Sequence, residues 1–290
     1  MADDIVTLLG DTRPPPPIPE ETRARLMAQL ATAREQWVER SYDPDALIWV
    51  GRRAAYLGNF HEAIAIFTEG VERWPDDARF YRHRGHRRIS LRQFADAVAD
   101  FEQAVQLIAG TPDSSEPDGQ PNVRDLPTST LHFNIWYHLG LTRYLRGEME
   151  RALAAYWAAY AVSGNPDALV AATHWLYMTL RRLGREEEAA TLLAPITEEM
   201  DVIENGAYHR LLLLYQGLLA PESLIDAPEN SNAALHDGTA GYGIGNWHLY
   251  HGRTDEAIDW FRRVYRGPQW AAFGFIAAEA DLARLRPSAA

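Results

Sequence analysis

The sequence predicts an all-α protein, an α-solenoid of about five to six helical pairs with a capping helix at each end. The first observation is a 34-residue internal period in small and aromatic residues: Gly51, Ala63 and Phe67, then Gly85, Ala97 and Phe101. The second is apolar residues at helical spacing between these positions. Such a period is typical of solenoids, whose units bury their apolar faces against one another. With 47% hydrophobic residues, the chain has enough apolar side chains for a substantial core.

The amino-acid composition excludes several classes of functional site. The net charge is −12, and cysteine and lysine are absent, so all 28 basic residues are arginine. Disulfides, zinc–thiolate sites, thiol nucleophiles and lysine Schiff bases are therefore excluded. The acidic balance argues against general nucleic-acid binding, which needs a basic surface. No apolar run predicts a membrane span and no signal peptide is visible, so a cytoplasmic protein is expected; a chain trimmed of its export signal would look the same.

The N-terminal region is expected to precede the repeats. Residues 1–19 end in a proline run and are expected to form an extended tail, with a ligand for a proline-binding domain as the alternative. Residues 20–43 are expected to form a capping helix over the first repeat. Its apolar residues recur at helical spacing: Leu26, Leu30, Ala33, Trp37 and Val38.

The repeat frame continues with two changes of spacing. Gly85 and Gly140 are 55 residues apart, which is 21 more than one period. Gly184 and Gly252 are 68 apart, twice 34, so a degenerate repeat is expected between them. Its first helix is predicted over residues 208–219, and its second, near residues 221–226, is expected to be short or irregular.

Residues 44–269 resemble the tetratricopeptide repeat, in which two antiparallel helices cross at small residues and large side chains fill the space beside them. Two copies match this pattern well and the others less closely. The physical reason for the pattern is that glycine or alanine lets two helices approach closely. The resemblance implies a right-handed solenoid whose concave surface is formed by the first helix of each pair.

Two loops are expected to interrupt this solenoid. Residues 110–129 are rich in proline, glycine and aspartate, and form either an ordered flap over the groove or a mobile surface loop. Residues 227–239 are expected to be an irregular loop before a glycine-rich helix that includes Gly241, Gly243 and Gly245, where tight helix packing or ligand access would explain the glycines. Residues 270–290 are predicted to be a C-terminal capping helix and tail.

The resemblance also assigns residues to the concave surface by their position in each first helix. The candidates for ligand binding are Arg52, Tyr56, Arg79, Arg82, His83, His86, Asn134, Tyr137, His138, His174, Tyr242 and Asn246. These side chains include almost no acid, and arginine presents forked donors to carboxylates and phosphates. The surface is therefore expected to hold an anion. The carboxylate clamps of some tetratricopeptide proteins rely on lysine, which is absent here, so the correspondence is one of principle.

A structural role for the arginines is the alternative. Arg84 and Arg88 occupy positions at which the repeat pattern expects apolar side chains. They are expected to pair with acids inside the stack, with Glu62, Glu69 or Asp100 as candidates, since charge runs commonly form paired or solvated faces.

Two classes of function follow. The first is a binding or scaffold protein that holds a peptide or a small anionic ligand in its concave groove. The second is an enzyme acting on a small molecule, with a pocket of His, Tyr and Arg covered by residues 110–129. A scaffold that self-associates is a third possibility. No metal site and no cofactor are expected, because histidine pairs such as His83 and His86 lack a recognisable carboxylate partner.

Overall fold

The computed structural model describes residues 4–117, 119–224 and 233–286, and it confirms the all-α solenoid prediction. Apart from a short hairpin of β1 (Ile5–Val6) and β2 (Thr12–Arg13), the elements are helical. The first five helices are α1 (Glu20–Glu39), α2 (Pro44–Tyr56), α3 (Phe60–Arg73), α4 (Ala78–Ser90) and α5 (Phe94–Ile108). The next five are α6 (Leu131–Leu145), α7 (Met149–Ala161), α8 (Pro166–Arg182), α9 (Glu186–Leu192) and α10 (Gly206–Tyr215). The last are the 3₁₀ turn η1 (Pro221–Leu224), α11 (Ala233–Tyr250), α12 (Thr254–Tyr265) and α13 (Phe273–Leu285).

Helices pair because a glycine on the first helix meets an aromatic ring on the second. A Cβ atom at Gly51 would lie 2.5 Å from the Phe67 ring, so any larger residue would force the two helices apart. The same glycine–aromatic contact recurs, each time 16 residues apart, at Gly85 and Phe101, Gly140 and Tyr156, and Gly245 and Phe261. Of the two explanations for the glycines of α11, the structure favours tight helix packing, since Gly241 and Gly243 also meet neighbouring side chains.

The degenerate repeat has the form predicted from its spacing. Its first helix is α10, and its second is replaced by the single turn η1. Residues 227–232 of the second expected loop lie outside the described residues. The prediction is wrong for residues 233–239, because they are helical and belong to α11.

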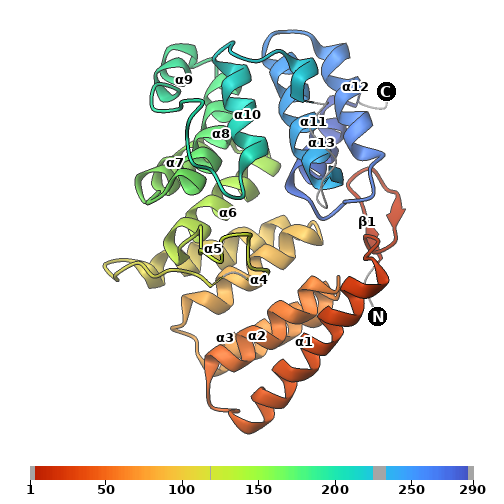
Figure 1. Ribbon diagram of the computed structural model, residues 1–290, viewed down its shortest axis with the longest axis vertical. Helices are drawn as coiled ribbons and strands as arrows, with labels where there is room; N and C mark the ends of the chain where they lie inside the picture. Colours follow the sequence, from red (N-terminus) through yellow and green to blue (C-terminus); the bar gives the residue numbers. More distant parts are fainter. Residues whose placement is uncertain (1–3, 118, 225–232, 287–290) are drawn as a thin grey trace.

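Figure 1 shows the helices following one another along an arc, with α11–α13 returning toward the N-terminal helices and the hairpin between them. Arg92 of the α4–α5 turn connects the two ends, because its guanidinium donates to both carboxylate oxygens of buried Glu279 on α13 at 3.2 and 2.6 Å. Its backbone φ is +62°, whereas the corresponding turns carry Gly58, Gly147 and Gly184. This turn thus has a non-glycine residue in the left-handed region, and the side chain of that residue pairs with Glu279.

The expectation of an extended tail for residues 1–19 is wrong for β1 and β2. The hairpin packs on the C-terminal helices: the Thr7 hydroxyl lies 2.8 Å from that of Tyr265, and Arg13 donates to the Tyr265 carbonyl at 2.9 Å. Burial of Ile5 supplies an apolar reason for this docking, which the proline run did not indicate.

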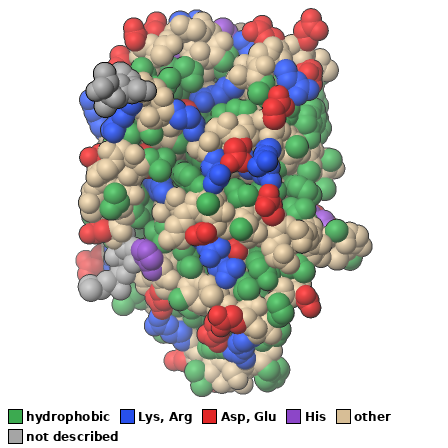
Figure 2. Space-filling view, turned by 180° about the vertical axis from the view of Figure 1, so that it is seen from behind, with side chains coloured by type: hydrophobic (Ala, Val, Ile, Leu, Met, Phe, Trp, Pro, Cys, Tyr) green, Lys and Arg blue, Asp and Glu red, His purple; other side chains and the backbone are tan. Residues whose placement is uncertain are grey.

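The surface carries mixed charges. On the face seen in Figure 2, acidic and basic side chains lie in small interspersed groups. Within the described part of the chain, no helix combines the length and apolar character needed to cross a membrane.

Candidate functional site

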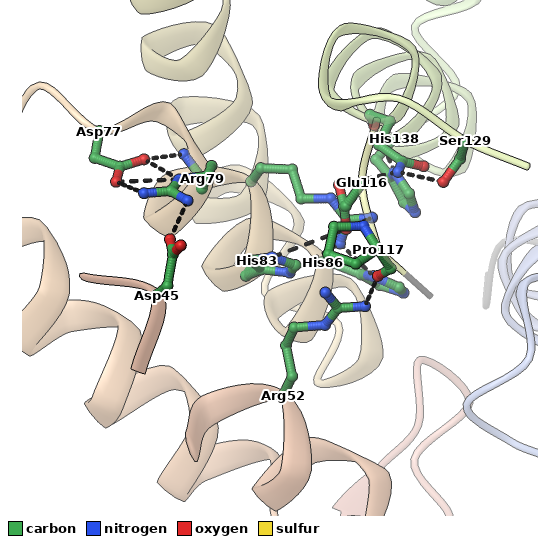
Figure 3. A network of polar contacts seen from close by, with 12 residues as sticks. Asp45, Arg52, Asp77, Arg79, His83, His86, Glu116, Pro117, Ser129 and His138 are labelled. Carbon is green, nitrogen blue, oxygen red and sulfur yellow. Dashed lines mark hydrogen bonds and ion pairs between the residues drawn. The ribbon is translucent and has the colours of Figure 1, made fainter. Parts of the chain in front are cut away.

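The first helices of three consecutive repeats, α2, α4 and α6, form a groove that the α5–α6 loop crosses. We call residues 113–117 and 119–121 of this loop the strap. Glu116 contacts α4 and α6, the Pro117 carbonyl accepts from Arg52 of α2 at 2.7 Å, and the Gly119 carbonyl accepts from Arg53 at 2.7 Å. Figure 3 shows Pro117 of the strap meeting the Arg52 side chain, and Glu116 in the same group of side chains as His83, His86 and His138.

A cavity of about 120 Å³ lies beneath the strap. It is lined by Arg52, Ala55, Tyr56, Phe67, Arg82, His83, His86, Arg87 and Glu116. Five of these residues were predicted from the sequence as ligand-binding: Arg52, Tyr56, Arg82, His83 and His86. The structure therefore brings together five of the six candidates from the first two repeats, although it places them under a segment of the chain rather than on an open surface.

Glu116 is the carboxylate of this cavity. Its Oε1 pairs with Nη2 of Arg82 at 2.9 Å, and its Oε2 accepts from Nδ2 of Asn134 on α6 at 3.0 Å. Arg82 is buried, and burial lowers the pKa of its guanidinium even beside this carboxylate. A buried charge of this kind needs a counter-ion, and the strap supplies it.

The two histidines of the cavity are neutral hydrogen-bond partners of Arg82. Its Nη1 lies 3.0 Å from Nδ1 of His83 and 3.4 Å from Nδ1 of His86. A guanidinium can only donate, so both Nδ1 atoms accept and each ring carries its proton on Nε2. Burial, reinforced by neighbouring arginines, holds the pKa of both imidazoles well below its usual range. Near neutral pH these rings therefore offer Nε2–H donors without adding positive charge.

Among the described residues that line the cavity, arginines outnumber carboxylates. Arg52, Arg82 and Arg87 face it, and Glu116 is the one carboxylate in this described set. Burial lowers the pKa of Arg87 to about 10, which still leaves it charged at neutral pH. Within the described residues, Arg87 has a ring contact with Phe60, at 5.6 Å, but no carboxylate partner. The described lining residues thus carry more positive than negative charge at neutral pH.

One predicted residue lies outside this site. Arg79 pairs with Asp77, the N-cap residue of α4, and with Asp45 of α2. These hydrogen bonds raise the pKa of its guanidinium further above its already high value. Arg79 therefore does not line this cavity, and its two acids near the helix N-terminus favour a structural role for it (Figure 3).

Three residues of the third repeat adjoin the groove but are buried. Asn134 holds Glu116, as described, and Tyr137 donates to the Tyr208 hydroxyl at 3.3 Å. His138 donates from Nδ1 to the Asn134 carbonyl at 2.5 Å, and its ring lies 4.5 Å from that of His86. The expectation of an open surface is wrong here, because Phe273 of α13 covers the rings.

The remaining three candidates lie in the C-terminal interior, so the expectation that they line a groove is also wrong. His174 is sandwiched between the rings of Tyr208 and Tyr215, and burial lowers its pKa to about 3. Tyr242 and Asn246 are 1% and 0% exposed. They hydrogen-bond to Arg182, Tyr144 and Asp281, because α13 packs over this part of the concave face.

The structural alternative is confirmed for Arg84 and Arg88. Both pair with buried Asp100 at 2.7 Å, which was one of the three acids proposed for them. Among the described residues, no group of three or more His, Cys, Asp and Glu side chains is arranged to hold a metal ion.

Three residues at or beside the site were not predicted from the sequence: Glu116, Arg87 and Phe273. The 21-residue insertion pointed to the loop but not to the residue in it that enters the groove. Arg87 lies in a run of arginines, and the sequence did not distinguish it from its neighbours. Phe273 belongs to a helix expected to cap the end of the solenoid, and nothing in the repeat frame indicates that it turns inward.

Comparison with known proteins agrees with the repeat frame. The tetratricopeptide-repeat family model matches residues 51–114. The small glutamine-rich tetratricopeptide repeat-containing protein 2 of Saccharomyces cerevisiae is 25% identical over 115 residues, which are 40% of this chain and 27% of the yeast protein. Among solved structures, YrrB, described as a tetratricopeptide protein with an unusual peptide-binding site, aligns over 80% of this chain and 90% of its own, with a TM-score of 0.46 and 14% identity.

The matched segment contains the second half of α2 and all of α3, α4 and α5, and hence every lining residue given above for the cavity except Glu116. The glycine–aromatic contacts of the pairs α2–α3 and α4–α5 recur in α6–α7 and α11–α12, outside the matched segment. The family model thus identifies tetratricopeptide repeats in residues 51–114, and the same helical pairing continues through the solenoid.

Proposed function

We propose that the groove formed by α2, α4 and α6 binds an extended, acidic segment of a partner protein. The observation that carries this proposal is the charge imbalance among the described lining residues of the cavity, where Arg52, Arg82 and Arg87 face a single carboxylate. That carboxylate belongs to the inserted loop and not to the helices that form the groove.

The donors of the groove suit a peptide. Arg52 and Arg53 bind main-chain carbonyls, which every peptide offers, and so favour an extended backbone without reading its sequence. Arg82 and Asn134 together bind both oxygens of one carboxylate, and so select an acidic side chain. A small carboxylate would bind only to Arg82 and Asn134, whereas a peptide binds to these two residues and also to Arg52 and Arg53.

The test is a peptide array in which heptapeptides carry one glutamate at varied positions, each beside the same peptide with glutamine. We expect the full chain to be retained several-fold more strongly on the glutamate peptides. Arg87→Ala is expected to weaken this preference without disturbing the interior, because Arg87 has no carboxylate partner within the described chain.

Arg151→Ala is the matched control, because it removes the same charge from a side chain that is 71% exposed on α7. Sodium acetate added at increasing concentration distinguishes a small-anion site, since it would then displace the peptides fully. Equal retention on glutamate and glutamine peptides, or equal losses for Arg87→Ala and Arg151→Ala, would contradict the proposal.

A further inference from the structure

We infer that the strap is an internal occupant of the peptide groove, which competes with the partner and resembles it in sequence. The partner segment is accordingly an extended one with Glu followed by Pro, and with glycine three positions after the glutamate. This inference rests on the proposed function and adds to it the chemical identity of the partner and the means by which its access is limited.

The first support is how the strap is held. Within the described residues, it contacts α2, α4 and α6 through the Glu116 carboxylate and the carbonyls of Pro117 and Gly119. Extended peptides bind to grooves by this combination of backbone contacts and one selective side chain. The first residues of the strap are joined to the start of α6, where the Asp113 carboxylate and the Ser114 carbonyl accept from the backbone of His132 and Leu131. At its far end Gln120 accepts from Arg25 of α1 at 3.1 Å, so the strap follows the first helices along the groove.

The second support is the close approach of Gly119 to the groove. A Cβ atom at this position would overlap the hydroxyl and ring of Tyr56, so no larger residue fits while both groups keep their places. Gly119 is buried, whereas its neighbour Gln120 and the preceding Pro117 are exposed. The groove therefore admits only a small residue at the position of Gly119 and binds a carboxylate at the position of Glu116. These two positions are the selective ones.

The third support is that the strap is held by polar contacts and not by packing into the apolar core. Helices α5 and α6, which it connects, pack directly on one another through Ala104, Ile108 and Ile135. The strap itself adds no apolar residue to this cluster. Beyond it, the loop is fastened separately: Arg124 pairs with Asp201, and Thr128 donates to Glu204 at 2.7 Å.

The experiment measures binding of a fluorescein-labelled peptide of residues 113–121 to the full chain by anisotropy. Gly119→Val in the chain is expected to expel the strap and to tighten binding of this peptide at least tenfold relative to the unmodified chain. The same peptide carrying Glu116→Gln should lose most of that gain. Gly164→Val is the control, because a Cβ at Gly164 has no heavy atom within 4 Å.

A second chain variant and a measurement of the melting temperature complete the experiment. If Gly119→Val fails to fold, as judged by circular dichroism, the chain variant Glu116→Gln replaces it, since it removes the charged anchor and leaves the backbone intact. Tighter peptide binding by either variant, and not by Gly164→Val, supports the inference. A strap that only stabilises the fold predicts a lower melting temperature with no gain in affinity, which would overturn it.

The failure of this inference is distinguishable from failure of the proposed function. If the strap peptide binds neither variant while the array still shows glutamate-dependent retention, the groove binds acidic peptides and the strap is not their analogue. If both experiments are negative, the proposed function fails as well.

Discussion

The molecule buries arginine in two places, and the two differ in where the counter-ion comes from. In the groove, the partner of Arg82 is Glu116, which lies on a loop. In the C-terminal interior, the partner of Arg182 is Asp281, which lies on helix α13 and is 1% exposed. The first ion pair separates if the loop moves, whereas the second separates only if a helix leaves the core.

The surroundings of the two guanidinium groups differ in the same sense. Arg182 binds both oxygens of Asp281, at 2.9 and 2.5 Å, and donates from Nε to Asn246 at 2.6 Å, whereas the Nε of Arg82 is buried without a partner in the described chain. The pKa of Arg182 is raised well above its usual value by Asp281 in spite of burial, and that of Arg82 is lowered by burial. The comparison teaches that a helix of the core fixes the interior pair, whereas an inserted loop supplies the acid of the groove pair.

Asp281→Asn should have the largest effect, because it leaves Arg182 buried without a charged partner. We expect the free energy of unfolding to fall by about 3–5 kcal/mol, the range for a broken buried ion pair. Urea denaturation followed by circular dichroism measures it. A loss close to that of Glu116→Gln would show that the two pairs are equivalent and remove the basis of the comparison.

Acid should destabilise the C-terminal interior through His174. Its folded-state pKa of about 3 is below the unfolded value of about 6.5, so protons bind preferentially to the unfolded chain in this window. Stability from this group is complete above pH 6.5 and falls as the pH decreases toward 3, by about 2 kcal/mol at pH 5.

His174→Phe keeps an aromatic ring between Tyr208 and Tyr215 but cannot titrate. The loss of stability between pH 7 and pH 5, measured by urea denaturation at each pH, should therefore be smaller in this variant by about that amount. An unchanged pH profile would mean that His174 is not kept neutral by its surroundings.

Glu116→Gln should have a smaller effect than Asp281→Asn. The amide still accepts a hydrogen bond, and the strap can yield so that water reaches Arg82. We expect a loss of about 1 kcal/mol, typical of one hydrogen bond to a charged group that is partly replaced. The measurement is the same urea titration, and a loss as large as that of Asp281→Asn would show that the strap is a fixed part of the core.

Asp201→Asn should have the smallest effect. Its pair with Arg124 has two short hydrogen bonds but lies on the surface, with side chains 46% and 69% exposed for Arg124 and Asp201. Exposed pairs contribute little, so the urea midpoint should not change measurably. A clear decrease would indicate that fastening the loop beyond the strap matters for folding.

The fold could be predicted from the sequence because its determinants are local and periodic. Gly51 and Phe67 are 16 residues apart in one helical pair, and repetition of that spacing identifies the other pairs. The site could be predicted in part for the same reason: Arg52, Tyr56, Arg82, His83 and His86 come from first helices of adjacent repeats, and neighbouring repeats bring such positions together.

The other predicted residues do not line the cavity, because the repeat frame gives the helix face that a residue occupies and not what covers that face. Asn246 and Tyr242 occupy the expected positions, yet α13 lies over them and supplies Asp281. Glu116 could not be predicted at all, because no periodic pattern sets the path of an inserted loop across a groove.

By itself, the sequence determined the helical pairs, their crossing points and the arginine-rich character of the concave face. These follow from side-chain volume and spacing within single repeats, over tens of residues. The tertiary structure alone decided which part of that face is filled by α13, which part is crossed by the strap, and which arginines receive a fixed counter-ion. Those outcomes depend on contacts between segments far apart in the chain, such as Arg92 with Glu279 and Arg182 with Asp281, whose energies a local pattern does not contain.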